Sequence, residues 1–389
     1  MTAAISKSEP QAPHATEIAV APTAGERSAI RETVVACLTG IWSRTLQTTP
    51  IYPDSNFFDL GGDSLLAVGL LLEIERQFGR KFPITTIYDA PTITAQADLL
   101  ESEGEAGFCP LVLLKSGDGS KPLFIVHGIG GTVIELDALG KQIRTDSPVY
   151  AIQARGLDGA EAPIESVAEM AAFYLDAIRQ VQPVGPYYLA GYSFGGLVAL
   201  EMARSLGEKD VALLLMIDSY ALPTTWPLAS RVSRSLRIWI NRVRLLATLP
   251  AGEIAGKLSR RVNTLFWRKS SLGATDGATR PNPARRWLGE PDPSLPLVLR
   301  QVQDAGGVAL MSYEPRPYNG KIVFLKAETT AVTFPARPAN IWAGLAKSFE
   351  LHAVPGDHAS MIHRHSDRVA DCISACLDQA DIRVKTDAG

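Results

Sequence analysis

The chain has 389 residues, of which 46% are hydrophobic and 20% are charged. It is too long for one average domain and apolar enough for packed cores, so we expect two or three domains. The formal net charge of −3 argues against a dedicated nucleic-acid-binding protein, because such proteins usually carry a basic excess.

The cysteines and the N-terminal residues indicate in which cellular compartment the protein is expected. The cysteines are scattered along the chain without the spacing of a CxxC motif: Cys37, Cys109, Cys372 and Cys376. This usage is typical of a reducing compartment and favours a cytoplasmic protein. The first ten residues lack the apolar segment of a signal peptide, and no stretch approaches the roughly 20 apolar residues of a membrane-spanning helix. We therefore expect neither secretion nor integral association with a membrane.

Residues 1–26 are rich in Ala, Pro, Thr, Ser and Glu and show no hydrophobic period, which predicts a disordered tail. From residue 27 apolar residues recur every three or four positions: Ile30, Val34, Leu38 and Trp42, then Ala67, Leu71, Ile74 and Phe78. This periodicity predicts a small helical bundle over residues 27–103. A Gly-containing break at residues 104–108 is interpreted as a linker.

Beyond the linker, over residues 109–381, short apolar runs alternate with helical stretches. The runs have the length of buried strands: residues 122–127, 149–154, 187–190, 211–217 and 322–327. Helices are expected between them, including residues 167–182 and 194–206. Such alternation indicates a mostly parallel sheet with helices on both faces. It stops between residues 220 and 312, where a Pro- and Arg-rich segment is inserted.

The first chemical motif is FFDLGGDSLL at residues 57–66. It places Ser64 at the start of a helix predicted to reach Phe78, after two glycines that allow a tight turn. An anion attached to the hydroxyl there would lie at the positive end of the helix dipole. From these residues alone, an ordinary helix-capping serine is the alternative.

Together with residues 41–42, 78–79 and 90–93, this motif resembles the peptidyl or acyl carrier domains of nonribosomal peptide and polyketide assembly lines. The resemblance covers residues 27–103. It implies that Ser64 carries a 4′-phosphopantetheine arm whose thiol holds an acyl or peptidyl thioester. It also implies a phosphopantetheinyl transferase as a partner.

The second constellation begins with GYSFG at residues 191–195. A predicted strand precedes it and a predicted helix follows it, which is the context that a nucleophile elbow requires. Small residues on both sides let the backbone hold Ser193 in a strained turn with its hydroxyl exposed. A nucleophile needs a base, and a turn near the C-terminus offers His358. The chain order of serine, acid and histidine is that of α/β-hydrolases.

Two carboxylates end apolar strands and compete as the acid, Asp218 and Glu328. Either would orient the imidazole and stabilise its cation. An oxyanion hole needs two N–H donors. We assign one to Phe194, which follows the nucleophile, and the other to Ile129 in the Gly-rich loop after the first buried strand. The same loop is also expected as a tight strand-to-helix turn, and it can be such a turn and supply an oxyanion donor at once.

Residues from about 109 to 381 resemble the C-terminal thioesterase domains that release products from nonribosomal peptide synthetases. The matches are spread over the domain: residues 122–127, 191–201, 312–320 and 356–358. The resemblance implies an α/β-hydrolase with a helical lid over about 220–312, and it favours Asp218 over Glu328. One departure is Gly128, where a proline is frequent after the loop histidine.

The lid region has a basic charge pattern. Residues 231–269 hold ten Lys or Arg against Glu253, whereas residues 51–103 hold nine Asp or Glu against three Lys or Arg. Four apolar lid residues share one helical face: Leu236, Trp239, Val243 and Leu246. Three readings of this helix stay open: a solvated lid face, a docking surface for the acidic carrier, and a helix at a membrane surface.

Two histidines and two cysteines near the C-terminus are considered as ligands of a metal ion. His363 and His365 lie close in sequence to Cys372 and Cys376, but this spacing matches no common zinc site. The two cysteines are also spaced as on one helix. We predict no metal.

These motifs predict an enzyme, a thioesterase in the carrier–thioesterase part of an assembly line. Ser193 would attack a thioester held at Ser64, and water, a hydroxyl or an amine would resolve the acyl-enzyme. Hydrolysis, macrocyclisation and acyl transfer stay open, as do the acyl group and the oligomeric state. We find no adenylation or condensation motif and expect upstream synthetase modules or acyl-loading enzymes as partners. The alternatives are a carrier with a docking or proofreading hydrolase module, and a general esterase with an incidental carrier domain.

Overall fold

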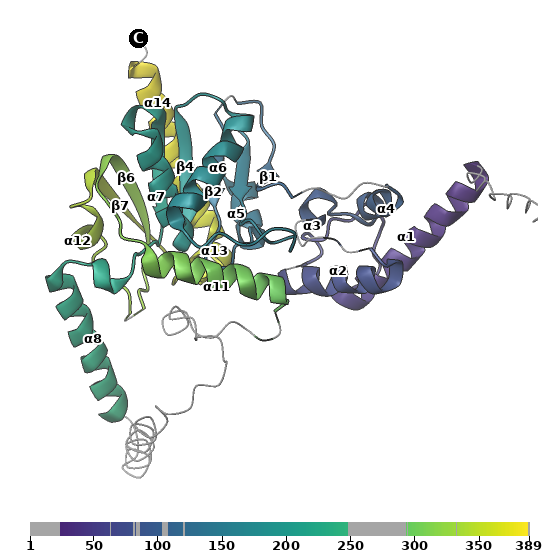
Figure 1. The fold of residues 1–389 in the computed structure, drawn as a ribbon, viewed down its shortest axis with the longest axis horizontal. Coiled ribbons are helices and arrows are strands. Elements are labelled where there is room, and N and C mark those ends of the chain that lie inside the picture. The colour runs from purple at the N-terminus through teal and green to yellow at the C-terminus, as the bar shows by residue number, and fades with distance from the viewer. Residues whose placement is uncertain are drawn as a thin grey trace, which may run out of the picture.

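The structure is a computed structural model that describes residues 24–62, 64–80, 82, 86–102, 108–119, 121–247, 293, 295–331 and 333–387. Its N-terminal helices, purple to blue in Figure 1, lie beside a larger part in which helices flank a central sheet. Of the predicted tail, residues 1–23 lie outside the described residues. The first helix begins at Ala24, so the last three residues of the predicted tail, 24–26, are helical. Most of the predicted linker, residues 104–107, is also outside the description.

The N-terminal part contains α1 (Ala24–Leu46), α2 (Ser64–Phe78), α3 (Thr86–Asp89) and α4 (Ile93–Glu101). Leu38, Trp42 and Ile74 are at most 1% exposed in its core. Trp42 donates its indole N–H to Gln96 Oε1 at 3.0 Å, so the buried polar group is paired. Ile30 is instead 51% exposed, because the first turns of α1 extend beyond the other helices (Figure 1). Helical periodicity therefore predicted the helix correctly but not the extent of its packing.

The sheet has seven strands in the described residues: β1 (Leu111–Lys115), β2 (Leu123–Val126), β3 (Val149–Ile152), β4 (Tyr187–Tyr192), β5 (Val211–Ile217), β6 (Tyr318–Ala327) and β7 (Ala346–Val354). Their order is β1-β3-β2-β4-β5-β6-β7. β1 is antiparallel to β3, and the other neighbouring pairs are parallel. The predicted mostly parallel α/β sheet is confirmed. β1 and β7 were absent from the predicted strands because edge strands keep exposed positions that interrupt an apolar run.

Helices cover both faces of this sheet (Figure 1). On one face, α6 (Val167–Val181) and α7 (Phe194–Leu206) pack over a core that includes Phe124 and Leu189. On the other, α5 (Asp137–Gln142) and α14 (Ser366–Asp387) pack over Ile125 and Leu215. Alternate residues of one strand thus enter opposite cores, which is why the central strands are apolar throughout.

The predicted lid is described only in part. Its described helices are η3 (Pro223–Thr225), α8 (Leu228–Ala247) and α11 (Leu297–Ser312), whereas residues 248–292 lie outside the described residues. On α8, Leu236 and Trp239 are 54% and 63% exposed. The side chains of Val243 and Leu246 are not described. Across the described parts of the chain, no helix is both long enough and apolar enough to cross a membrane.

Candidate active site

Ser193 lies in the sharp turn between β4 and α7. Its backbone has φ 55° and ψ −117°, an uncommon and strained conformation for a residue other than glycine. Glycines allow this turn, because a Cβ at Gly191 would overlap the Gly195 carbonyl and one at Gly195 would overlap the His127 carbonyl. The Ser193 N–H donates to the Ile217 carbonyl at 2.8 Å, which ties the turn to the end of β5.

Two distant segments bring His358 and Asp218 to this serine. His358 lies between β7 and α13 (Ser360–His363), and its Nε2 is 3.0 Å from Ser193 Oγ. Its Nδ1 is 2.8 Å from Oδ2 of Asp218, which directly follows β5. Because an ionised carboxylate only accepts hydrogen bonds, Nδ1 carries the proton and Nε2 accepts from the serine hydroxyl. The three side chains form one hydrogen-bonded chain.

The Asp218 carboxylate is only 2% exposed, so its charge requires donors. Besides His358, Asp218 Oδ1 accepts from the Tyr220 hydroxyl at 3.1 Å and from the Ala327 N–H at 3.3 Å. Burial, and secondarily the charge of Asp218, raises the pKa of Tyr220 well above its usual value. Tyr220 therefore stays protonated and acts as a donor to the carboxylate.

Two aromatic rings pack against His358. The Tyr192 ring is stacked on the imidazole with 5.2 Å between ring centroids, and the Phe334 centroid lies at 5.3 Å. The Tyr192 hydroxyl also donates to the His358 carbonyl at 2.7 Å. Sequence reasoning missed Tyr192, Tyr220 and Phe334. Adjacency to Ser193 and Asp218 could have signalled the two tyrosines, but nothing in the sequence marks Phe334.

The alternative acid lies elsewhere. Glu328 is exposed, and its backbone N–H donates to the Val354 carbonyl at 2.9 Å. Since Nδ1 of His358 pairs with Asp218, the geometry favours Asp218 over Glu328.

The Gly-rich loop after β2 begins with His127, which is 2% exposed. Its Nδ1 is 2.5 Å from the Gly128 carbonyl and must be the donor, whereas Nε2 accepts from the Tyr174 hydroxyl at 2.6 Å. Burial lowers the pKa of His127 to about 4 and keeps the ring neutral. The predicted donors occupy the expected elements, with Ile129 in this turn and Phe194 as the first residue of α7.

Ser64 is the first residue of α2, as its motif predicts. Gly61 precedes it with φ 86°, and a Cβ at Gly62 would overlap the Phe57 ring, so both glycines suit this turn. Asp63 and the side chain of Ser64 lie outside the described residues.

The helical part contacts the sheet part beside this motif. Lys141 of α5 lies over the Phe58 ring, 5.7 Å from its centroid, and its Nζ is 3.9 Å from Asp59 Oδ1. Leu299 of α11 is buried in the same apolar cluster as Leu71 of α2. The motif that carries Ser64 therefore packs against the part that carries Ser193.

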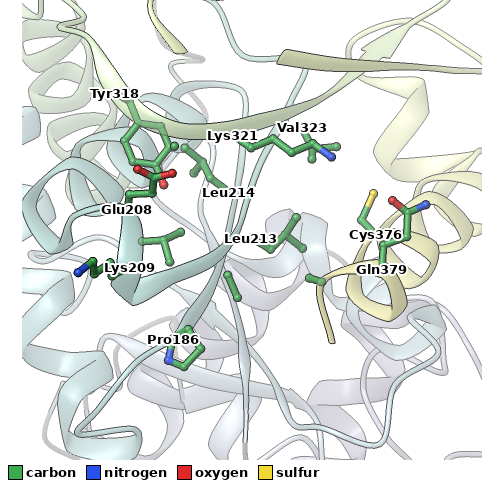
Figure 2. Close-up of a pocket in the computed structure, with 14 residues that line it drawn as sticks. Pro186, Glu208, Lys209, Leu213, Leu214, Tyr318, Lys321, Val323, Cys376 and Gln379 are labelled. Carbon is green, nitrogen blue, oxygen red and sulfur yellow. The ribbon is translucent and has the colours of Figure 1, made fainter. Parts of the chain in front are cut away.

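A separate pocket of about 800 Å³ lies at the other end of the sheet (Figure 2). The first residues of β5 line it with residues of β6, η2 (Glu208–Asp210) and α14. Asp218 follows the last residue of β5, so the pocket and the Ser193 site lie at opposite strand ends.

The two histidines and two cysteines considered as ligands do not form a metal site. His365 lies between α13 and α14 rather than within a helix, whereas Cys372 and Cys376 are helical. Within the described ranges, no three His, Cys, Asp or Glu side chains are grouped to hold a metal ion.

Comparisons with known proteins identify both parts. Residues 38–100 match the family model for a phosphopantetheine attachment site, and residues 121–238 match the model for a thioesterase domain. The chain is 41% identical over 170 residues to the dimodular nonribosomal peptide synthase of Bacillus subtilis (strain 168), covering 43% of this chain and 7% of that protein. It is 30% identical over 295 residues to the malpibaldin synthetase of Mortierella alpina, covering 75% of this chain and 5% of that protein.

A solved structure of a holo four-domain nonribosomal peptide synthetase bound to AMP and glycine shares the fold. It has a TM-score of 0.51 and 24% identity, and the match covers 95% of this chain and 27% of that chain. The chain thus spans a small fraction of the length of the relatives it matches. It consists of a phosphopantetheine attachment domain followed by a domain of the thioesterase family.

Proposed function

We propose that this chain is the carrier–thioesterase part of a nonribosomal peptide or polyketide-type assembly line. It holds an acyl or peptidyl group as a thioester at Ser64 and releases it through an ester on Ser193. The observation that carries the proposal is the hydrogen-bonded chain from Asp218 through His358 to Ser193, next to an attachment domain in the same polypeptide.

The geometry supports a two-step acyl transfer. His358 Nε2 takes the Ser193 proton as Oγ attacks the acyl carbonyl, and Asp218 stabilises the resulting imidazolium. The N–H groups of Ile129 and Phe194 donate to the carbonyl oxygen as it gains charge. His358 Nε2 would then donate its proton to the leaving group. His358 then activates the water, hydroxyl or amine that cleaves the ester on Ser193.

The residues around Ser64 fit a 4′-phosphopantetheine group. The first N–H groups of α2 lack helical partners, and the helix dipole favours the negative phosphodiester there. A Cβ at Gly61 would meet nothing within 4 Å, so the space beside this glycine of the turn is open. When bound, the group supplies a thiol that presents the acyl group as a thioester.

The proposal includes partners that the chain does not provide. A phosphopantetheinyl transferase modifies Ser64, and upstream synthetase modules or acyl-loading enzymes supply the acyl group. A cytoplasmic location is also proposed, and it is supported by four cysteines that are all free thiols.

The test is an intact-mass time course. A promiscuous phosphopantetheinyl transferase loads the protein from a panel of acyl-CoAs, and wild type is compared with Ser193→Ala. Ser205→Ala, on the same helix α7 but outside the site, is the matched control. We expect the acyl mass to appear on all three proteins and to decay to the holo mass only in wild type and the control.

Other outcomes favour the alternatives. Equal persistence on all three proteins would support a carrier with a docking or proofreading hydrolase module. Rapid turnover of simple soluble esters together with slow release of the tethered acyl group would support a general esterase.

A further inference from the structure

Gly128 is held by hydrogen bonds to its carbonyl and lies against a buried carboxyl group. Its carbonyl accepts from His127 Nδ1 at 2.5 Å and from the Gly131 N–H at 3.1 Å. The carboxyl group belongs to Glu135, a residue of η1 (Ile134–Leu136) that the reaction above does not use, and the Gly128 N–H favours its ionised form. One glycine therefore connects a buried histidine, the end of its own loop and an acidic side chain.

The contact with Glu135 requires glycine at this position. An ideal Cβ at residue 128 would lie 2.7 Å from Glu135 Oε1 and 3.3 Å from the Tyr192 ring. A proline, frequent here in the family that the sequence resembles, would place a Cβ there and would also lack the N–H that favours the ionised form of Glu135. Gly128 and Glu135 are thus a matched pair in this chain.

Holding Gly128 also orients the next N–H. The Gly128 carbonyl and the Ile129 N–H belong to one planar trans peptide and point in opposite directions. His127 and the Gly131 N–H fix the carbonyl, and Glu135 fixes the preceding peptide. Together they leave the Gly128–Ile129 peptide little freedom to rotate.

Glu135 lies in the same environment as the reactive histidine. Its carboxyl is close to Gly128, whose position faces Tyr192, and the Tyr192 ring is stacked on His358. Burial raises the pKa of Glu135 to about 7, while the charge on His358 and the Gly128 N–H favour its ionised form. Both protonation states offer an oxygen that accepts the Gly128 N–H, so the contact does not depend on one charge state.

We propose that Glu135 is a positioning residue that, with His127, clamps Gly128 and thereby keeps the Ile129 N–H directed at the acyl oxygen. This inference rests on the proposed function, in which Ile129 is an oxyanion donor. It adds a residue from η1, and it accounts for the glycine at position 128.

The clamp is tested in the unmodified protein with soluble substrates, butyryl-N-acetylcysteamine and p-nitrophenyl butyrate. The variants are Glu135→Ala, Glu135→Gln, Gly128→Ala and the double variant Gly128→Ala/Glu135→Ala, each checked for folding by its thermal midpoint. Hydrogen exchange at Gly128 is measured in parallel, because it reports the clamp even if no turnover occurs.

We expect Gly128→Ala to lower kcat about 100-fold with little change in KM, as for a misplaced catalytic group. Glu135→Ala should lower kcat about 10-fold and remove protection of the Gly128 amide. Glu135→Gln keeps an oxygen that can accept a hydrogen bond. Its kcat and its protection of the Gly128 amide should both stay within about threefold of wild type. In the double variant the Cβ no longer meets a carboxylate, so its kcat should lie near that of Glu135→Ala alone.

The inference is overturned if the kcat of the double variant falls by the product of the two single-variant decreases. It is also overturned if Glu135→Ala leaves both kcat and protection of the Gly128 amide unchanged. An inactive wild type whose Gly128 amide is protected through Glu135 would instead count against the proposed function for butyryl groups and leave the clamp standing. Loss of protection in Glu135→Gln as well would show that the carboxyl does not accept from Gly128, and would also overturn the inference.

Discussion

The two candidate site serines, Ser64 and Ser193, both lie at helix starts, and their surroundings differ. Ser64 is the first residue of α2 and belongs to one contiguous motif. Ser193 precedes α7 in a strained conformation, and its hydrogen-bond partner His358 is 165 residues away in sequence. A hydroxyl at a helix start is therefore not a nucleophile by position alone. We propose that Ser193 becomes one because the fold places an imidazole and a buried carboxylate beside it.

Ser64 and Ser193 also differ in whether a second protein is needed for their chemistry. We propose that a transferase activates Ser64, so the chain need only present it at the positive end of a helix. In the same proposal Ser193 acts without a second protein and uses residues from three segments of the chain. Substitutions in the two parts should therefore affect loading at Ser64 and turnover at Ser193 separately.

Ser64→Ala should have the largest effect, complete loss of loading, because no other side chain is proposed to take the phosphopantetheine. Intact mass after treatment with a phosphopantetheinyl transferase would show no added group, whereas Ser55→Ala would be modified normally. Hydrolysis of soluble butyryl thioester should remain within about twofold of wild type, since the Ser193 site is intact. A modified Ser64→Ala protein would contradict the assignment.

Asp218→Asn should lower kcat for soluble esters by about 10⁴-fold, because the imidazole loses the carboxylate that orients it and stabilises its cation. Glu328→Gln is the matched control and should stay within about twofold, since Glu328 is exposed. Steady-state kinetics on both variants measure this. The opposite ranking would assign the acid to Glu328.

Acid should weaken the sheet part before the helical part. The pKa of His127 is about 4 in the folded protein, against about 6.5 when unfolded. Below pH 6.5 the unfolded chain binds the proton more readily, so the free energy of unfolding falls as pH drops towards 4. This amounts to about 2 kcal/mol at pH 5.

The measurement is thermal or denaturant unfolding at pH 7 and pH 5. His127→Gln lacks the titrating ring and should lose less stability between these values than wild type does. Residues 24–102 contain no histidine, so their unfolding is free of this contribution. An identical pH dependence in wild type and variant would show that His127 is not the cause.

Lys141→Ala should have the smallest effect. Between the two parts it removes a cation–π contact with Phe58 and a long ion pair with Asp59, and within α5 it removes an ion pair with Asp137 at 2.9 Å. Such partly exposed contacts contribute about 0.5–1 kcal/mol, so release of a tethered acyl group should slow about two- to fivefold. Turnover of soluble ester should be unchanged, and Lys209→Ala, exposed on η2, is the control. Equal slowing of both reactions would place Lys141 in the Ser193 site instead.

Much of the fold could be predicted because its signals are local. Periodic apolar residues predicted α2 and α7, and continuous apolar runs predicted the central strands from β2 to β6. The turn at Ser193 was predictable for the same reason, since only glycine at positions 191 and 195 avoids overlap with nearby carbonyls. The edge strands and the exposed start of α1 depend on what packs beside them, which periodicity does not encode.

By itself, the sequence determined the fold class and marked Ser64, Ser193 and His358 as residues of interest, because short motifs carry that information. Only the tertiary structure gives a geometric reason to favour Asp218 over Glu328, since both follow strands and Asp218 Oδ2 lies 2.8 Å from Nδ1 of His358. It also decided that Tyr192 and Phe334 enclose His358. Such contacts join segments far apart in the chain, and their distances depend on the packing of the sheet and its loops rather than on any local pattern of residues.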